Sequence, residues 1–194
     1  MITTKHVTAD EVALIRTCVH EAAHAVVATV LGGAIHCASA AFAGGSTTYE
    51  HLPEDVAGAV AFAGPYAEAF WEAGTGRHPD PWQITAALAA NRRDERALHA
   101  SRYHGPFVGH SRDARTVAQA VIPPLIERRW PAVMRTAALL FRCGEVTHSD
   151  ICAALGAPAS GNELALAALR RGAVPGWFQA VPEPVTDAAC HGRH

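Results

Sequence analysis

The run His20-Glu21-Ala22-Ala23-His24 has the residue types and spacing of a catalytic metal site. Residues four apart lie on one face of an α-helix, about one turn from each other, so the two imidazoles can bind a single ion. Glu21 then lies beside that ion, where its carboxylate can take a proton from a metal-bound water and later deliver it to a leaving amine. The motif therefore predicts zinc-dependent hydrolysis of peptide bonds.

The residues around the motif favour a buried site. Val19 and the run Ala25-Val26-Val27 continue an apolar stripe on both sides of it. Burying two histidines and a glutamate without a common partner is costly, and a metal ion would be that partner. The alternative interpretation is a surface helix on which His20, Glu21 and His24 make ordinary contacts with solvent.

Capping signals and apolar periodicity predict the elements that position the motif. Thr8 is a suitable N-cap with Glu11 three residues later, and Gly32-Gly33 supplies the end of a helix over residues 8–31. The next predicted elements are a hairpin or irregular strand pair over 34–49 and helices over 56–71, 82–100, 113–121, 124–143, 151–155 and 162–171. The expected fold is mainly α, with a small β-hairpin after the helix that carries the motif.

The chain is expected to form one domain over residues 1–160. Residues 161–194 are a C-terminal extension, partly helical and then a flexible tail from about Val181, because proline and glycine interrupt its pattern.

A catalytic zinc needs a third protein ligand from elsewhere in the fold. We predict Asp80, which precedes the helix expected over residues 82–100. Asp80 is also a good N-cap, and if capping is its only role then Glu68 or Glu72 on the preceding helix is the alternative ligand.

The sequence resembles the peptidase domain of the FtsH-type ATP-dependent metalloproteases, which opens with a helix bearing HEAGHA. Here that stretch reads HEAAHAVVATVL. The family continues with a Gly-Gly-Arg-x-Ala-Glu-like stretch, which is similar to Ala63-Gly64-Pro65-Tyr66-Ala67-Glu68, and then with an aspartate early in a later helix. The run Gly144-Glu145-Val146-Thr147 looks like the turn before the last helix of the family.

The resemblance covers about Ala13 to Leu155 and implies a helical zincin-like metallopeptidase fold. It implies His20, His24 and Asp80 as zinc ligands and Glu21 as the general base. A non-catalytic descendant that keeps the fold as a binding or regulatory module is the alternative, because the motif residues alone do not separate the two.

Composition narrows the expected partners. The formal net charge is −2, from 16 Lys and Arg against 18 Asp and Glu, without a long block of either sign, so nucleic acid and anionic membranes are not expected partners. A signal peptide and a membrane span are not apparent, which predicts a soluble cytoplasmic protein. A Walker-type GxxxxGK[ST] motif is not apparent either, so the ATPase module of the family is not expected here. The expected substrates are flexible polypeptides, with unfolding left to a separate ATPase or adaptor. The oligomeric state stays open.

Overall fold

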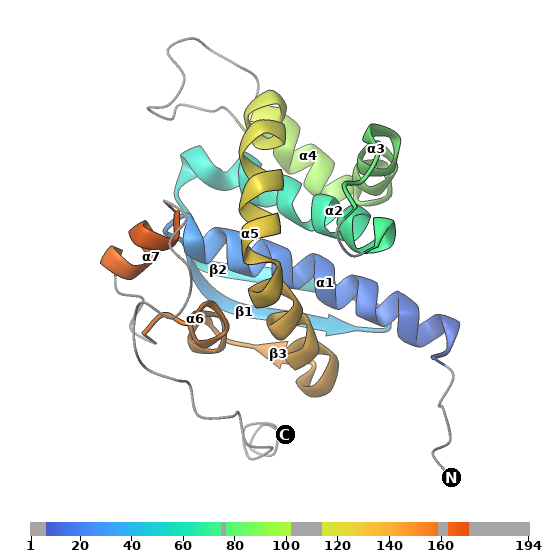
Figure 1. Ribbon diagram of the computed structural model, residues 1–194, viewed down its shortest axis with the longest axis horizontal. Helices are drawn as coiled ribbons and strands as arrows, with labels where there is room; N and C mark the ends of the chain where they lie inside the picture. Colours follow the sequence, from blue (N-terminus) through green and yellow to red (C-terminus); the bar gives the residue numbers. More distant parts are fainter. Residues whose placement is uncertain (1–6, 75–76, 102–113, 159–162, 171–194) are drawn as a thin grey trace.

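The structure is a computed structural model that describes residues 7–74, 77–101, 114–158 and 163–170. Within these ranges the chain is mainly helical, with seven α-helices and one three-stranded antiparallel sheet (Figure 1). This confirms a mainly α fold with a small β element after the first helix. The tail predicted after Val181 lies outside the described residues.

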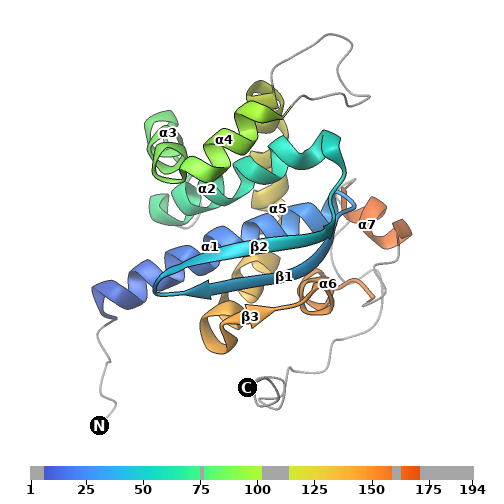
Figure 2. The same ribbon diagram turned by 180° about the vertical axis from the view of Figure 1, so that it is seen from behind.

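The first helix, α1 (Ala9–Val30), is the centre of the fold. It begins with the predicted capping box, in which Thr8 and Glu11 satisfy each other's backbone N–H groups. Every residue from Cys18 to Val30 is buried, because α1 packs against α2, α5 and β1. Figures 1 and 2 show α1 between the sheet and α5. The motif therefore lies in the part of the helix that is covered on all sides.

The sheet consists of β1 (Ala34–Ala41), β2 (Gly44–His51) and the short β3 (Glu145–Val146). The hairpin of β1 and β2 was expected, whereas β3 lies in a segment predicted as a turn. The strand order β2-β1-β3 leaves β2 at one edge of the sheet. Figure 2 shows β2 as the strand nearest to α2 and α4.

The segment predicted as one helix over residues 82–100 is two helices, α3 (Pro81–Ala90) and α4 (Arg92–Ala100). The chain breaks at Asn91, which has φ −103° and ψ 66° outside the helical region. The Asn91 amide donates to the carbonyl of Ala87 at 2.8 Å and so satisfies one of the last carbonyls of α3. This corrects the sequence prediction, and the break creates a new helix start at residue 92.

The remaining helices are α2 (Ala57–Ala73), which follows a short 3₁₀ turn (Glu54–Val56), α5 (Ala114–Cys143), α6 (His148–Leu155) and α7 (Glu163–Arg170). Two helices were predicted in place of α5, parted by Pro123-Pro124. The structure has one, because buried residues on both sides of the prolines, such as Ile122 and Ile126, pack along α1 and α2 as a single face. Tertiary packing here outweighs the local effect of proline.

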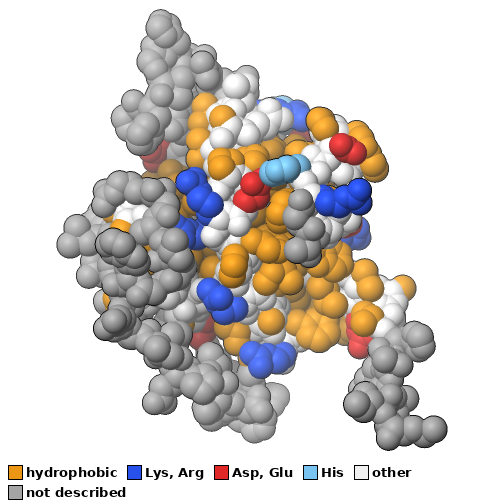
Figure 3. Space-filling view, in the orientation of Figure 1, with side chains coloured by type: hydrophobic (Ala, Val, Ile, Leu, Met, Phe, Trp, Pro, Cys, Tyr) orange, Lys and Arg blue, Asp and Glu red, His pale blue; other side chains and the backbone are white. Residues whose placement is uncertain are grey.

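Among the described residues no helix is long and apolar enough to cross a membrane. On the face seen in Figure 3, basic and acidic side chains are scattered among hydrophobic ones, and the described residues form no continuous block of one sign there.

Candidate metal centre

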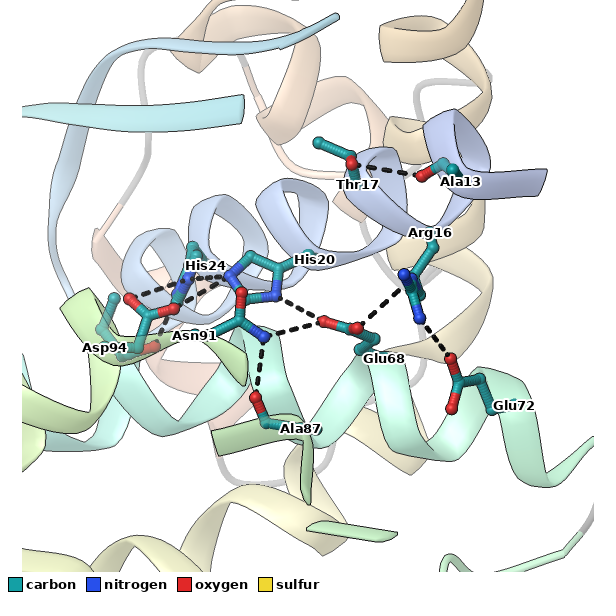
Figure 4. A network of polar contacts seen from close by, with 11 residues as sticks. Ala13, Arg16, Thr17, His20, His24, Glu68, Glu72, Ala87, Asn91 and Asp94 are labelled. Atoms are coloured by element: carbon teal, nitrogen blue, oxygen red, sulfur yellow. Dashed lines mark hydrogen bonds and ion pairs between the residues drawn. The ribbon is translucent and has the colours of Figure 1, made fainter. Parts of the chain in front are cut away.

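The three motif side chains are buried on α1. His20, Glu21 and His24 are only 7%, 7% and 6% exposed. The alternative of a solvent-facing helix surface is therefore excluded. The two histidines face α2 and the beginning of α4 (Figure 4).

A third side chain, Asp94, completes a compact group with the two histidines. Its Oδ2 lies 3.0 Å from His20 Nε2, and its Oδ1 lies 3.5 Å from His24 Nε2. The two Nε2 atoms are themselves 3.0 Å apart. One ligand atom from each residue lies within 4.8 Å of the others, so this largely buried group could hold a metal ion.

The structure brings Asp94, rather than Asp80, into this group. Asp80 is exposed at the N-cap of α3, where it forms a capping box with Gln83. Asp94 is the third residue of α4 and reaches the histidines because the chain breaks at Asn91. The sequence signal for Asp94 is an acidic residue in the first turn of a helix. Because residues 82–100 were predicted as one helix, Asp94 was placed in its interior and this first turn was not recognised.

Hydrogen bonds on the far side of each imidazole fix how the rings face Asp94. His24 Nδ1 lies 2.7 Å from the carbonyl oxygen of Val60, which can only accept, so Nδ1 carries the proton. His20 Nδ1 lies 3.2 Å from Glu68 Oε2 and donates to that carboxylate. In each neutral ring the Nε2 atom then presents a lone pair to the centre of the group.

The centre of the group consequently requires a positive charge. Two Nε2 lone pairs and the carboxylate of Asp94 face one another at 3.0 to 3.5 Å, an arrangement that repels unless a proton or a cation lies between them. In the protein without an ion, burial opposes a charge on His20, but hydrogen bonds to Asp94 and Glu68 outweigh it and raise the pKa of His20 to about 9. Asp94 is half-buried, which favours its neutral form, yet its bonds to the two histidines outweigh this effect and hold the pKa of its carboxyl well below the usual range.

Glu68 and Glu72, the alternative ligands, lie outside the group. Glu68 supports His20 from behind and is held by Asn91 Nδ2 at 3.0 Å and Arg16 Nε at 3.4 Å. Glu72 is exposed and pairs with Arg16 Nη1 at 3.0 Å. Figure 4 shows this chain of contacts running from Asp94 through His20 to Glu72. Glu68 therefore orients a ligand, as carboxylates behind metal-binding histidines commonly do.

Two glycines allow the site to form. A Cβ atom at Gly64 on α2 would lie 2.5 Å from His24 Nε2 and 2.7 Å from His20 Nε2. A Cβ atom at Gly45 on β2 would lie 2.5 Å from Cγ of Glu21. All three distances are shorter than real contacts allow. The first glycine leaves space for the imidazoles, and the second leaves space for the general base that the sequence predicts.

Glu21 lies beside the metal-binding group and is not part of it. Thr47 on β2 donates its hydroxyl hydrogen to Glu21 Oε2 at 2.8 Å. This bond fixes one carboxylate oxygen and leaves the other without a hydrogen bond among the described residues. The arrangement matches the predicted position of Glu21, one step round the helix from the two ligands.

His20, Glu21, His24 and Asp94 line a cavity of about 460 Å³. Its walls are the motif on α1, the inner face of β2 and the start of α4. Gly45, Thr47 and Tyr49 alternate along β2 and so share the face that meets α1. Burial of Tyr49, followed by the charges of Glu21 and Asp94, raises the pKa of its phenol, which stays a hydrogen-bond donor at neutral pH.

Comparisons of the chain with protein-family models, with curated proteins and with solved structures found no match.

Proposed function

We propose that this protein is a zinc-dependent metallopeptidase of the HExxH type, with a fold and site similar to the peptidase domain of FtsH-type metalloproteases. The observation that carries the proposal is the inward direction of three metal-binding atoms, Nε2 of His20, Nε2 of His24 and a carboxylate oxygen of Asp94. The family places its third ligand early in a later helix, and Asp94 has that place in α4.

The donor set fits zinc better than it fits the harder divalent cations. Two imidazole nitrogens and one carboxylate suit Zn²⁺, whereas Ca²⁺ and Mg²⁺ prefer sites made of oxygen alone. Three protein ligands are also the number typical of catalytic zinc, which keeps one position open to water or substrate. When bound there, zinc would lower the pKa of a water molecule and polarise the carbonyl of a peptide.

Glu21 is the proposed general base. Its carboxylate lines the cavity next to the ligands, and Thr47 holds it in one orientation. A base in this position can take a proton from the attacking water and pass it to the nitrogen of the leaving amine.

The edge position of β2 supports a polypeptide as the substrate. An extended peptide can add to the open edge of a sheet through main-chain hydrogen bonds, and here that edge borders the cavity with Glu21. Only a flexible segment can adopt such a conformation, which is why we propose flexible polypeptides as substrates and a separate ATPase or adaptor as the source of unfolded ones.

The proposal is tested with Glu21→Gln, which keeps the size of the side chain and removes its ability to act as a base. We expect this variant to hold as much zinc as the wild type and to cleave a fluorogenic peptide or casein at least about a hundredfold more slowly, in line with the loss of acid–base catalysis. Glu50→Gln is the matched control, because Glu50 lies exposed on the same strand as Thr47.

Equal cleavage by wild type and Glu21→Gln would contradict the proposed role of Glu21. A wild type that holds zinc and cleaves no polypeptide would favour the alternative, a non-catalytic binding module that keeps the metallopeptidase fold.

A further inference from the structure

Two arginines stand on the wall of the cavity directly before the metal-binding aspartate. Arg92 and Arg93 are the first two residues of α4, and both line the cavity. Both are exposed. The charge of Arg93 acts on the phenol of Tyr49, which belongs to β2 and lines the same cavity. The guanidinium of Arg93 is thus close to the inner face of β2.

The guanidinium groups of Arg92 and Arg93 are unpaired within the described part of the chain. In the described part of the chain, neither guanidinium has a hydrogen bond or an ion pair. Arg16 and Arg135 differ, since Arg16 pairs with Glu68 and Glu72, and Arg135 donates to the carbonyl of Ala154. The two guanidinium groups on the cavity wall are therefore free to bind an anion from outside.

Their position in the helix is also unfavourable for stability. The N-terminal end of a helix carries partial positive charge and favours acidic side chains, so cations in the first turn are slightly destabilising. α4 nevertheless has two arginines there, before Asp94 and Glu95. Residues that go against such a helix preference next to a candidate site are typical of residues that bind a ligand.

The charge balance of the cavity also favours binding of an anion. With a dication on His20, His24 and Asp94, the carboxylates of Asp94 and Glu21 offset the ion, and the two guanidiniums leave a net positive charge. A guanidinium presents paired N–H donors that match the two oxygens of a carboxylate. The cavity is therefore complementary to a peptide that carries a carboxylate.

We propose that the cavity selects peptides with a carboxylate within about two residues of the cleaved bond, and that Arg92 and Arg93 bind it. This inference rests on the proposed peptidase function. The spacing follows from α4, whose first two residues lie within one turn, about 5.4 Å, of Asp94. An extended peptide advances about 3.4 Å per residue, so the residues next to the scissile bond lie within reach of the arginine side chains.

The test uses one peptide sequence with Glu or Gln at each of the two positions on either side of the cleaved bond, and with a free or amidated C-terminus. Binding is measured by fluorescence anisotropy on the zinc-loaded Glu21→Gln protein, and cleavage is measured on the wild type. We expect at least one Glu peptide to bind about tenfold more tightly than its Gln counterpart, a difference of about 1.4 kcal/mol.

The double variant Arg92→Gln/Arg93→Gln should lose this preference while holding the same amount of zinc. Arg96→Gln is the matched control and should keep the preference, because Arg96 is exposed one turn further along α4 and does not line the cavity. If Glu and Gln peptides bind equally, but amidation of the C-terminus weakens binding to the wild-type arginines and not to the double variant, the carboxylate that the arginines bind is the terminal one.

The inference is overturned if neither the exchange of Glu for Gln nor amidation of the C-terminus changes binding. It is also overturned if the double variant keeps the preference or weakens the charged and uncharged peptides to the same extent. Cleavage without charge preference would contradict this inference and leave the peptidase proposal intact. Binding with an arginine-dependent preference but without cleavage by the wild type would support the inference and contradict the peptidase proposal.

Discussion

At the scale of single residues, three hydrogen bonds decide what the site can hold. Val60 and Glu68 each accept from the Nδ1 of a histidine, and so both Nε2 atoms turn their lone pairs inward. Thr47 donates to Glu21 and holds it beside the group. The two histidines and Glu21 are thus oriented in the absence of an ion, which is the condition for a precise metal site.

The raised pKa of His20 predicts how binding of zinc depends on pH. At pH 7.5 the metal-free protein carries a proton on His20, since its pKa is about 9, whereas a metal ligand must be neutral. Binding of zinc should therefore release about one proton per chain, and the apparent affinity for zinc should rise with pH up to about 9. Calorimetric titration in buffers of different ionisation enthalpy counts the protons. Binding of zinc without release of a proton would contradict either the raised pKa of His20 or its proposed role as a ligand.

The grouping of His20, Glu21 and His24 on one helix could be predicted from the sequence, and the contact of Asp94 with the two histidines could not. His20, Glu21 and His24 are related by the geometry of one helix, which depends only on local sequence. The position of Asp94 depends on a break at Asn91 and on the packing of α4 against α2. Asp80 had a clear local signal, and that signal was for capping.

At the scale of elements, the close approach of α2 and β2 to α1 sets the space for the side chains of the site. Gly64 on α2 faces the two imidazoles, and Gly45 on β2 faces Glu21. The two contacts concern different functions, metal binding in the first case and the general base in the second. They can therefore be tested separately.

We expect Gly64→Ala to lose zinc and Gly45→Ala to keep it. The new methyl at position 64 would occupy the space of both Nε2 atoms, although alanine is favoured over glycine in a helix by about 0.5–1 kcal/mol. The methyl at position 45 would displace only Glu21 and so reduce cleavage. Metal content, peptide cleavage and circular dichroism of both variants measure this. Zinc binding that survives Gly64→Ala would contradict the geometry of the site.

Local capping signals predicted the starts of several elements well. The capping boxes of α1 and α3 begin at Thr8 and Asp80, as predicted from the side chains there, whereas α6 begins at His148, three residues before the predicted start at 151. The predicted end of a helix at the prolines within α5 was wrong, and the break at Asn91 was not predicted. Packing against other helices decides both features. The strand β3 was missed since two residues carry no periodic pattern.

At the scale of the whole molecule, the site exists only where four elements meet. α1 supplies the histidines and the base, α2 supplies Glu68 and Gly64, α4 supplies Asp94, and β2 supplies Thr47. These elements are far apart in the sequence and pack around the buried half of α1 (Figures 1 and 2). An ion that joins α1 to α4 should also stabilise the folded chain, because it binds the folded state and not the unfolded one.

The most direct test of this account is the zinc content of the purified protein, measured by elemental mass spectrometry on the wild type, Asp94→Asn and Asp80→Ala. We predict about one zinc per chain in the wild type, its loss in Asp94→Asn and its retention in Asp80→Ala, which should only lower the free energy of unfolding by about 0.5–2 kcal/mol through loss of the α3 cap. A wild type without zinc after reconstitution, or retention of zinc by Asp94→Asn together with its loss in Asp80→Ala, would contradict the account.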